Sequence, residues 1–189
     1  MPTGHVFIAT SLDGFVARLD HQIDWLMKQN TDGEDVGYEE FQGGIDGIVM
    51  GRGSFENVLT FGEWPYQKPV IVMSKSLGKG DIPSHLVSKV RITSLDPPDL
   101  MASLGSEGWS RVYVDGGKVV QSFIRVGMIE DMCVTAIPIL IGTGLRLFGD
   151  IEEDIDLELL GSKSFASGLV QSTYRVLGND RRSEKSDVQ

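Results

Sequence analysis

The sequence has few cysteines, few histidines and no long apolar run, and each shortage excludes a class of protein. Its one cysteine, Cys133, rules out a disulfide framework and sits in an apolar stretch, where a small buried hydrophobe is expected. The three histidines, His5, His21 and His85, lack the spacing of metal ligands, so no metal site is predicted. No run approaches membrane-spanning length and no signal segment is present, which predicts a soluble, cytoplasmic protein without a membrane partner.

Basic residues are also scarce. The 17 lysines and arginines are outnumbered by 27 acidic residues, and the formal net charge is -10. A nucleic-acid-binding protein needs a basic face against the phosphate backbone, so this class is disfavoured. A small anionic ligand remains compatible with the composition if the few cations gather in one cleft, because local charge governs such binding.

Alternating apolar runs and helical patterns predict one α/β domain, and 189 residues can bury a full core without disulfides. Buried strands are predicted at 5–9, 45–50, 68–73, 90–93, 112–114 and 132–141, and helices at 35–41, 54–59, 97–104 and 119–127. Period-two patterns at 157–160 and 170–176 predict a terminal antiparallel hairpin. These elements make an α/β sandwich with a mixed sheet over 1–177, followed by a polar tail at 178–189 that is expected to be disordered.

The stretch from Gly51 to Ser54 has the pattern of an anion-binding loop. An apolar strand stops at Gly51, Arg52 and Gly53 follow, and Ser54 is expected to open a helix. Glycines let the backbone approach a ligand closely, and the first N–H groups of a helix point at it with the positive end of the helix dipole. Arg52 can add a forked, permanently charged grip. An ordinary turn with an N-cap and a surface arginine would show the same sequence pattern.

Other predicted strands also end in small polar or charged residues. Besides 51–54, these ends lie at 13–14, 74–75 and 115–118. In parallel α/β sheets, ligands bind beyond the carboxyl ends of the strands, where such residues converge. Each end alone is only a turn, but the four together predict a cleft for a phosphorylated ligand.

Five ordered segments resemble the dihydrofolate reductase superfamily, and within it the riboflavin-biosynthesis reductase, the C-terminal domain of a bifunctional deaminase-reductase. The segments are 11–14, 50–56, 72–76, 114–118 and 138–148, and the resemblance extends over nearly the whole chain up to Val176. It implies a dihydrofolate reductase-like, three-layer sandwich whose mixed, mostly parallel sheet has eight strands flanked by helices. It also implies an NADPH-dependent reduction, although the zinc-binding His-x-Glu and Cys-x-x-Cys elements of the deaminase are absent from the sequence.

The resemblance assigns residues to both halves of a site. Ten positions are implied for the cofactor: Ala9 at the nicotinamide; Gly51, Arg52, Gly53 and Ser54 at the adenosine-side phosphates; Ser74 and Lys75 at the 2′-phosphate; and Gly116, Gly117 and Lys118 at the pyrophosphate. The 2′-phosphate positions favour NADPH over NADH.

Three further residues are candidates for the substrate half. Asp13 matches an element near the family's active cleft, and Asp35 lies near the helical acid of the folate-reducing branch, so either is a candidate for proton transfer. An Asp-Gly turn and a helix cap are the structural alternatives for these two residues. Trp25 is a candidate wall of the substrate pocket, with a core tryptophan as its alternative.

The expected function is therefore an NADPH-dependent reductase resembling 5-amino-6-(5-phosphoribosylamino)uracil reductase, with hydride transfer to a small heterocyclic or ribosyl substrate. Dihydrofolate reduction is an alternative that requires Asp35 to be buried in the cleft. A non-catalytic nucleotide-binding module is a second alternative. A homodimer through 137–141 and the final strands is also expected from the resemblance.

Overall fold

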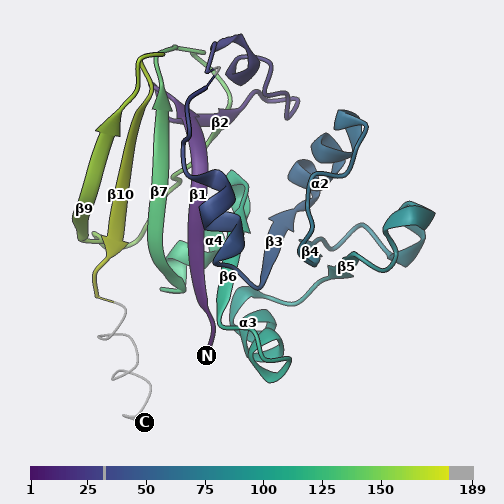
Figure 1. The fold of residues 1–189 in the computed structure, drawn as a ribbon. Coiled ribbons are helices and arrows are strands. Elements are labelled where there is room, and N and C mark those ends of the chain that lie inside the picture. The colour runs from purple at the N-terminus through teal and green to yellow at the C-terminus, as the bar shows by residue number, and fades with distance from the viewer. Residues whose placement is uncertain (32, 179–189) are drawn as a thin grey trace.

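The computed structural model describes residues 1–31 and 33–178, and an eight-stranded sheet forms its centre (Figure 1). The strand order is β5-β4-β3-β6-β1-β7-β10-β9, in which β1 and β3 to β7 pair in parallel and β10 is antiparallel to both β7 and β9. The strands are β1 Thr3–Ser11, β3 Gly47–Gly51, β4 Val70–Met73, β5 Val90–Thr93, β6 Arg111–Asp115, β7 Ile129–Ile137, β9 Leu157–Ser164 and β10 Val170–Val176. The prediction of a mixed, mostly parallel eight-stranded sheet is confirmed.

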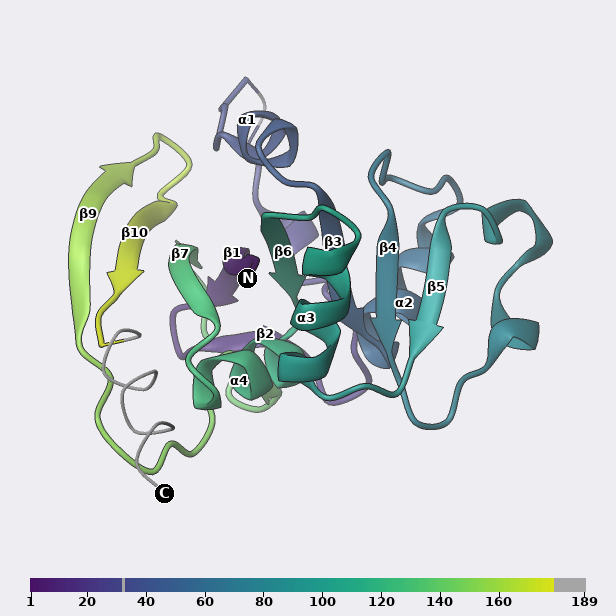
Figure 2. The same cartoon turned by 90° about the horizontal axis from the view of Figure 1, so that it is seen from below.

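Helices cover both faces of this sheet, so the domain has three layers (Figure 2). The α-helices are α1 Tyr38–Gly43, α2 Arg52–Val58, α3 Pro97–Ser106 and α4 Gly117–Arg125, and the 3-10 turns are η1 Leu26–Lys28, η2 Leu59–Phe61, η3 Lys79–Asp81 and η4 Ser84–Leu86. Successive residues of a strand point to opposite faces, and β3 shows this directly. Val49 joins the core under α3 and α4, whereas Ile48 and Met50 join the core under α1 and α2.

The sequence of α4 explains why it forms and where it lies. Its apolar residues fall on one helical stripe, and Val120 and Phe123 are fully buried against the sheet. Lys118 and Arg125 lie on the exposed face. Fully burying one such apolar side chain contributes roughly 1.5–3 kcal/mol, so this packing fixes the helix and, with it, the Gly116 turn at its start.

Several element boundaries differ from the prediction, and three of the differences have a clear local cause. Helix α2 begins at Arg52 rather than Ser54, so the loop is tighter than expected. Helix α1 begins at Tyr38, because the left-handed Gly37 precedes it. Strand β7 ends at Ile137, since Pro138 has no N–H with which to continue the ladder.

The terminal hairpin is confirmed and extends the sheet beyond β7. All eight residues of β9 are exposed, and β9 is the last strand of the sheet. A separate two-stranded sheet pairs β2 Phe15–Ala17 with β8 Leu145–Arg146. Of the predicted tail, residues 179–189 lie outside the described residues. Among the residues described, no helix is long and apolar enough to span a membrane, and no three His, Cys, Asp or Glu side chains are grouped as metal ligands.

Candidate functional site

A cavity of about 880 Å³ opens at the carboxyl ends of β1, β3, β4 and β6. Every position predicted to bind the cofactor lines it except Lys75: Ala9, Gly51, Arg52, Gly53, Ser54, Ser74, Gly116, Gly117 and Lys118. The Lys75 side chain is exposed and lies outside the lining. The parallel strands therefore bring together residues that are up to about a hundred positions apart in sequence, as expected for strand ends in an α/β sheet.

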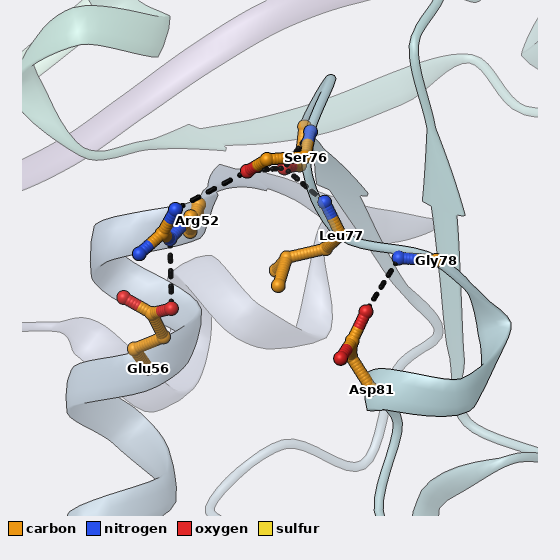
Figure 3. A network of polar contacts seen from close by, with 7 residues as sticks. Arg52, Glu56, Ser76, Leu77, Gly78 and Asp81 are labelled. Atoms are coloured by element: carbon orange, nitrogen blue, oxygen red, sulfur yellow. Dashed lines mark hydrogen bonds and ion pairs between the residues drawn. The ribbon is translucent and has the colours of Figure 1, made fainter.

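Arg52 occupies one side of this cavity and is held by two partners (Figure 3). Its Nε donates to Glu56 Oε1 at 2.7 Å, and its Nη1 donates to Ser76 Oγ at 3.2 Å. Ser74 Oγ accepts the backbone N–H groups of Ser76 at 3.2 Å and Leu77 at 3.0 Å, which shapes the turn after β4. A guanidinium has five N–H donors, so this arrangement orients Arg52 and leaves donors for an anionic ligand.

Glycines let three segments meet closely at the rim of the cavity. A Cβ on Gly116 would lie 2.5 Å from Ser54 Oγ, and Gly116 has a φ of 86°, which L side chains rarely adopt. A Cβ on Gly53 would lie 2.3 Å from the ring of His21. Helix α4 begins directly after Gly116, so its unpaired N–H groups face the same space. The crowding shows that these glycines let the three segments pack closely at the rim of the cavity.

The carboxyl group of Asp115 lies at the end of β6 in the same cavity. Burial raises its pKa, against the lowering effect of hydrogen bonds from Tyr113 and Ser54. The hydroxyl of Tyr113 lies 3.1 Å from Asp115 Oδ1 and 2.9 Å from the carbonyl oxygen of Phe7. Burial also raises the pKa of Tyr113 well above its ordinary value, so this phenol keeps its one proton.

That single proton determines how the cluster is bonded. The Tyr113 hydroxyl can donate to the Phe7 carbonyl oxygen or to Asp115 Oδ1, and its one proton serves one of these acceptors at a time. The site thus contains a buried, hydrogen-bonded carboxyl group whose pKa is raised above its ordinary value by burial.

Aromatic side chains form the wall next to this acid. The rings of Phe7 and Tyr38 lie 5.5 Å apart, and Tyr66 lines the same part of the cavity. Burial raises the pKa of Tyr38 to about 12 and that of Tyr66 further still, with the Asp115 charge as a second cause for both. Sequence reasoning missed this cluster. Tyr113 and Asp115 stand two residues apart on one face of a strand, and that spacing is the one signal that could have indicated a shared site.

Asp13 lies outside the cavity lining and joins two turns. Its carboxylate accepts the backbone N–H groups of Ile141 at 3.3 Å and Gly142 at 2.8 Å. Hydrogen bonding from the Ser11 side chain is the largest cause that lowers the pKa of Asp13. An ionised, turn-stabilising carboxylate suits the structural alternative for Asp13.

Asp35 and Trp25 also lie outside the lining. Asp35 is exposed, and its carboxylate accepts the N–H of Gly37 at 2.7 Å. The dihydrofolate alternative required this residue to be buried in the cleft, so it loses its support. Trp25 is fully buried in a core cluster with Ile137 and Leu169. It backs the cavity only through neighbouring residues.

Comparison with known proteins gives one consistent result. A Shewanella sp. PV-4 structure whose name assigns it to riboflavin biosynthesis is 35% identical, with a TM-score of 0.86 and coverage of 93% of this chain and 99% of that one. The uncharacterized protein YwjB of Bacillus subtilis (strain 168) is 30% identical over 166 residues, covering 87% of this chain and 92% of YwjB.

A more distant structure shares the fold. The Thermotoga maritima diaminohydroxyphosphoribosylaminopyrimidine deaminase/5-amino-6-(5-phosphoribosylamino)uracil reductase has a TM-score of 0.71 at 14% identity, over 93% of this chain and 56% of that one. The family model described as the RibD C-terminal domain matches residues 2–171, and the chain therefore belongs to the RibD C-terminal domain family.

Proposed function

We propose that this protein is an NADPH-dependent reductase that resembles 5-amino-6-(5-phosphoribosylamino)uracil reductase and transfers a hydride to a small heterocyclic or ribosyl compound. The observation that supports this best is the single cavity in which the glycine-rich strand ends meet the carboxyl group of Asp115, whose pKa is raised by burial. The glycine-rich loops suit phosphates, and the carboxyl group and aromatic rings beside them suit a ring and a proton transfer.

The cofactor half consists of the loops after β3, β4 and β6. Arg52 and the serines after β4 offer a cation and hydroxyl donors for a 2′-phosphate, which favours NADPH over NADH. The glycine rim at Gly116 and the start of α4 offer backbone N–H groups for the pyrophosphate. When bound, the nicotinamide would supply the hydride, and the chain would provide its orientation and the exclusion of water.

Asp115 is proposed as the proton donor in the substrate half. A reduced C=N or C=C bond takes up one hydride and one proton, and a carboxylic acid whose pKa is raised by burial can deliver that proton. The Tyr113 hydroxyl fixes the orientation of the Asp115 carboxyl group. Asp115 replaces Asp13 and Asp35 in the proposed role, since neither of those lines the cavity.

The test is a titration of the purified protein with NADPH and NADH, followed by tryptophan quenching, on wild type and on Arg52→Ala. Tight binding of NADPH alone is expected. Loss of a charge-assisted bond costs roughly 1.5–3 kcal/mol, so the substitution should weaken NADPH binding about tenfold to a hundredfold and leave NADH binding nearly unchanged. Arg91→Ala is a matched control, because Arg91 pairs with Glu107 outside the cavity. If neither nucleotide binds, the proposed reductase function is refuted and the glycine-rich loops are ordinary turns.

We also propose a homodimer that uses the hairpin of β9 and β10. On this edge strand Leu157, Leu159 and Leu160 are 42%, 56% and 47% exposed, and unpaired strand edges favour pairing with another chain. Light scattering should give the mass of two chains, and Leu159→Lys should shift it toward one. A monomeric wild type at all accessible concentrations would remove this proposal.

A further inference from the structure

The loop at 18–24, which follows β2, contains a strained residue. His21 has a φ of 67°, and no other non-glycine residue has a positive φ in the part of the chain that the structure describes. An L side chain in this conformation costs stability, and strain of this kind is concentrated at functional sites. His21 also lines the cavity, so the strain lies where a ligand would bind.

The imidazole ring of His21 lies directly against Gly53. A Cβ on Gly53 would lie 2.3 Å from both Nδ1 and Cε1 of this ring and 3.2 Å from its Cγ, so a side chain at position 53 would displace the ring. Those three atoms form one edge of the ring, and Nε2 belongs to the other edge. Within the described residues, neither ring nitrogen has a hydrogen-bond or ion-pair partner. The ring therefore brings an unused hydrogen-bonding group to the glycine-rich loop after β3.

The loop that carries His21 is held in a closed turn. Arg18 donates from Nε and Nη2 to the two carboxylate oxygens of Asp24, at 2.6 and 3.0 Å. The backbone N–H of His21 donates to the Arg18 carbonyl oxygen at 3.0 Å. Trp25, the next residue after the turn, is fully buried in the core. These contacts fix the direction in which the loop presents His21.

The strand order indicates which phosphate His21 would contact. Strand β3 lies between β4 and β6, and Arg52 extends toward Ser76 on the β4 side. The His21 loop lies on the other side of β3, since Val16 of β2 packs at the start of α4, where a Cβ on Gly117 would lie 3.1 Å from Val16 Cγ2. The proposed function assigns the pyrophosphate to that end of α4 and the 2′-phosphate to Arg52. His21 is therefore on the pyrophosphate side.

We propose that His21 is a cofactor-binding residue whose ring donates a hydrogen bond to the pyrophosphate of the dinucleotide. This inference rests on the proposed function, because that function supplies the dinucleotide. An imidazole N–H is a suitable donor to a phosphate oxygen, and hydrogen bonds to charged acceptors are among the stronger ones in proteins. The strained backbone at His21 then has a role, since it places the ring beside Gly53.

The test compares His21→Asn and Arg52→Ala in titrations with NADPH and with adenosine 2′-monophosphate, which carries the 2′-phosphate but no pyrophosphate. Asparagine accepts a positive φ, so His21→Asn removes the ring and keeps the turn. This variant should weaken NADPH binding about tenfold and leave the affinity for the monophosphate unchanged. Arg52→Ala should weaken the binding of both ligands. Unchanged NADPH affinity in His21→Asn, or an equal loss for both ligands, would overturn the inference.

A second variant separates hydrogen bonding from packing. His21→Phe keeps a flat ring but has no N–H, so it should bind NADPH as weakly as His21→Asn does; wild-type affinity in this variant would also overturn the inference. A thermal melt shows whether each variant is folded, and the asparagine variant alone is sufficient for the test. Failure of the wild type to bind NADPH would refute the proposed function, whereas normal wild-type binding that His21→Asn leaves intact would refute only this inference.

Discussion

Asp115→Asn offers a quantitative test of the raised pKa of Asp115. Because the pKa of Asp115 is raised in the folded state, the native protein holds this proton at pH values where the unfolded chain has already released it. The wild type should therefore lose stability as pH rises from the ordinary aspartate pKa of about 3.9 to the raised value, and the loss should be complete above it. One proton gives a slope of at most about 1.4 kcal/mol per pH unit.

The asparagine variant removes this proton and keeps the shape of the side chain. Its amide oxygen can accept from the Tyr113 hydroxyl as the carboxyl oxygen does, so the fold should persist. Urea unfolding at a series of pH values should show the free energy of unfolding of the variant rising relative to that of the wild type through the same pH window. Above that window the difference between the two should stay constant. A stability difference that does not change with pH, or that changes in the opposite direction, would refute the raised pKa of Asp115.

Asp46→Asn is a matched control for which the stability difference should change with pH in the opposite direction. The backbone N–H groups of Arg111 and Ser110 lower the pKa of Asp46, so the wild-type advantage over that variant should appear as pH rises and be lost in acid.

In turnover assays, Asp115→Asn should lower kcat by about a hundredfold to a thousandfold with NADPH affinity unchanged, because general acids contribute roughly that much. The wild-type kcat should fall as pH rises through the raised pKa, since only the protonated acid is active.

Two backbone positions give further predictions. Gly116→Ala should destabilise the fold by roughly 1–2 kcal/mol and weaken NADPH binding, because φ is 86° and the new Cβ would meet Ser54 Oγ. Urea unfolding measures the first effect and nucleotide titration the second. An unchanged unfolding midpoint would contradict the steric argument. His21 has a φ of 67°, the one positive value found for a non-glycine residue in 1–31 and 33–178. His21→Gly should therefore raise the free energy of unfolding by about 0.5–1 kcal/mol in urea, whereas a loss of stability would show that the ring's contact with Gly53 outweighs the strain.

The sequence predicted the sheet and the meeting of the glycine-rich strand ends at one cavity because both depend on local patterns. Apolar runs such as 45–50 mark strands that are buried on both faces, and their ends must meet once the strands are parallel. The approach of Gly53 to His21 could not be predicted, since it depends on how a distant loop folds back.

The substrate end was harder to predict for the same reason. Tyr38, Tyr66 and Tyr113 come from a helix, a loop and a strand, and no spacing in the sequence links them. Asp13 and Asp35 fit motifs, but an aspartate one or two residues before a glycine serves a turn as readily as a reaction. Here both carboxylates accept backbone N–H groups.

The pairing of Arg52 with Glu56 bears on how a ligand would respond to ionic strength. At 2.7 Å, the carboxylate already neutralises the guanidinium before any anion arrives. Added salt would weaken the attraction between Arg52 and a phosphate, but it would also weaken the ion pair with Glu56 that competes for the same guanidinium. The weaker ion pair would offset part of the weaker attraction to the phosphate. Nucleotide affinity should therefore fall less steeply with salt than at a site whose arginine stands alone, and Glu56→Gln should restore the steeper dependence.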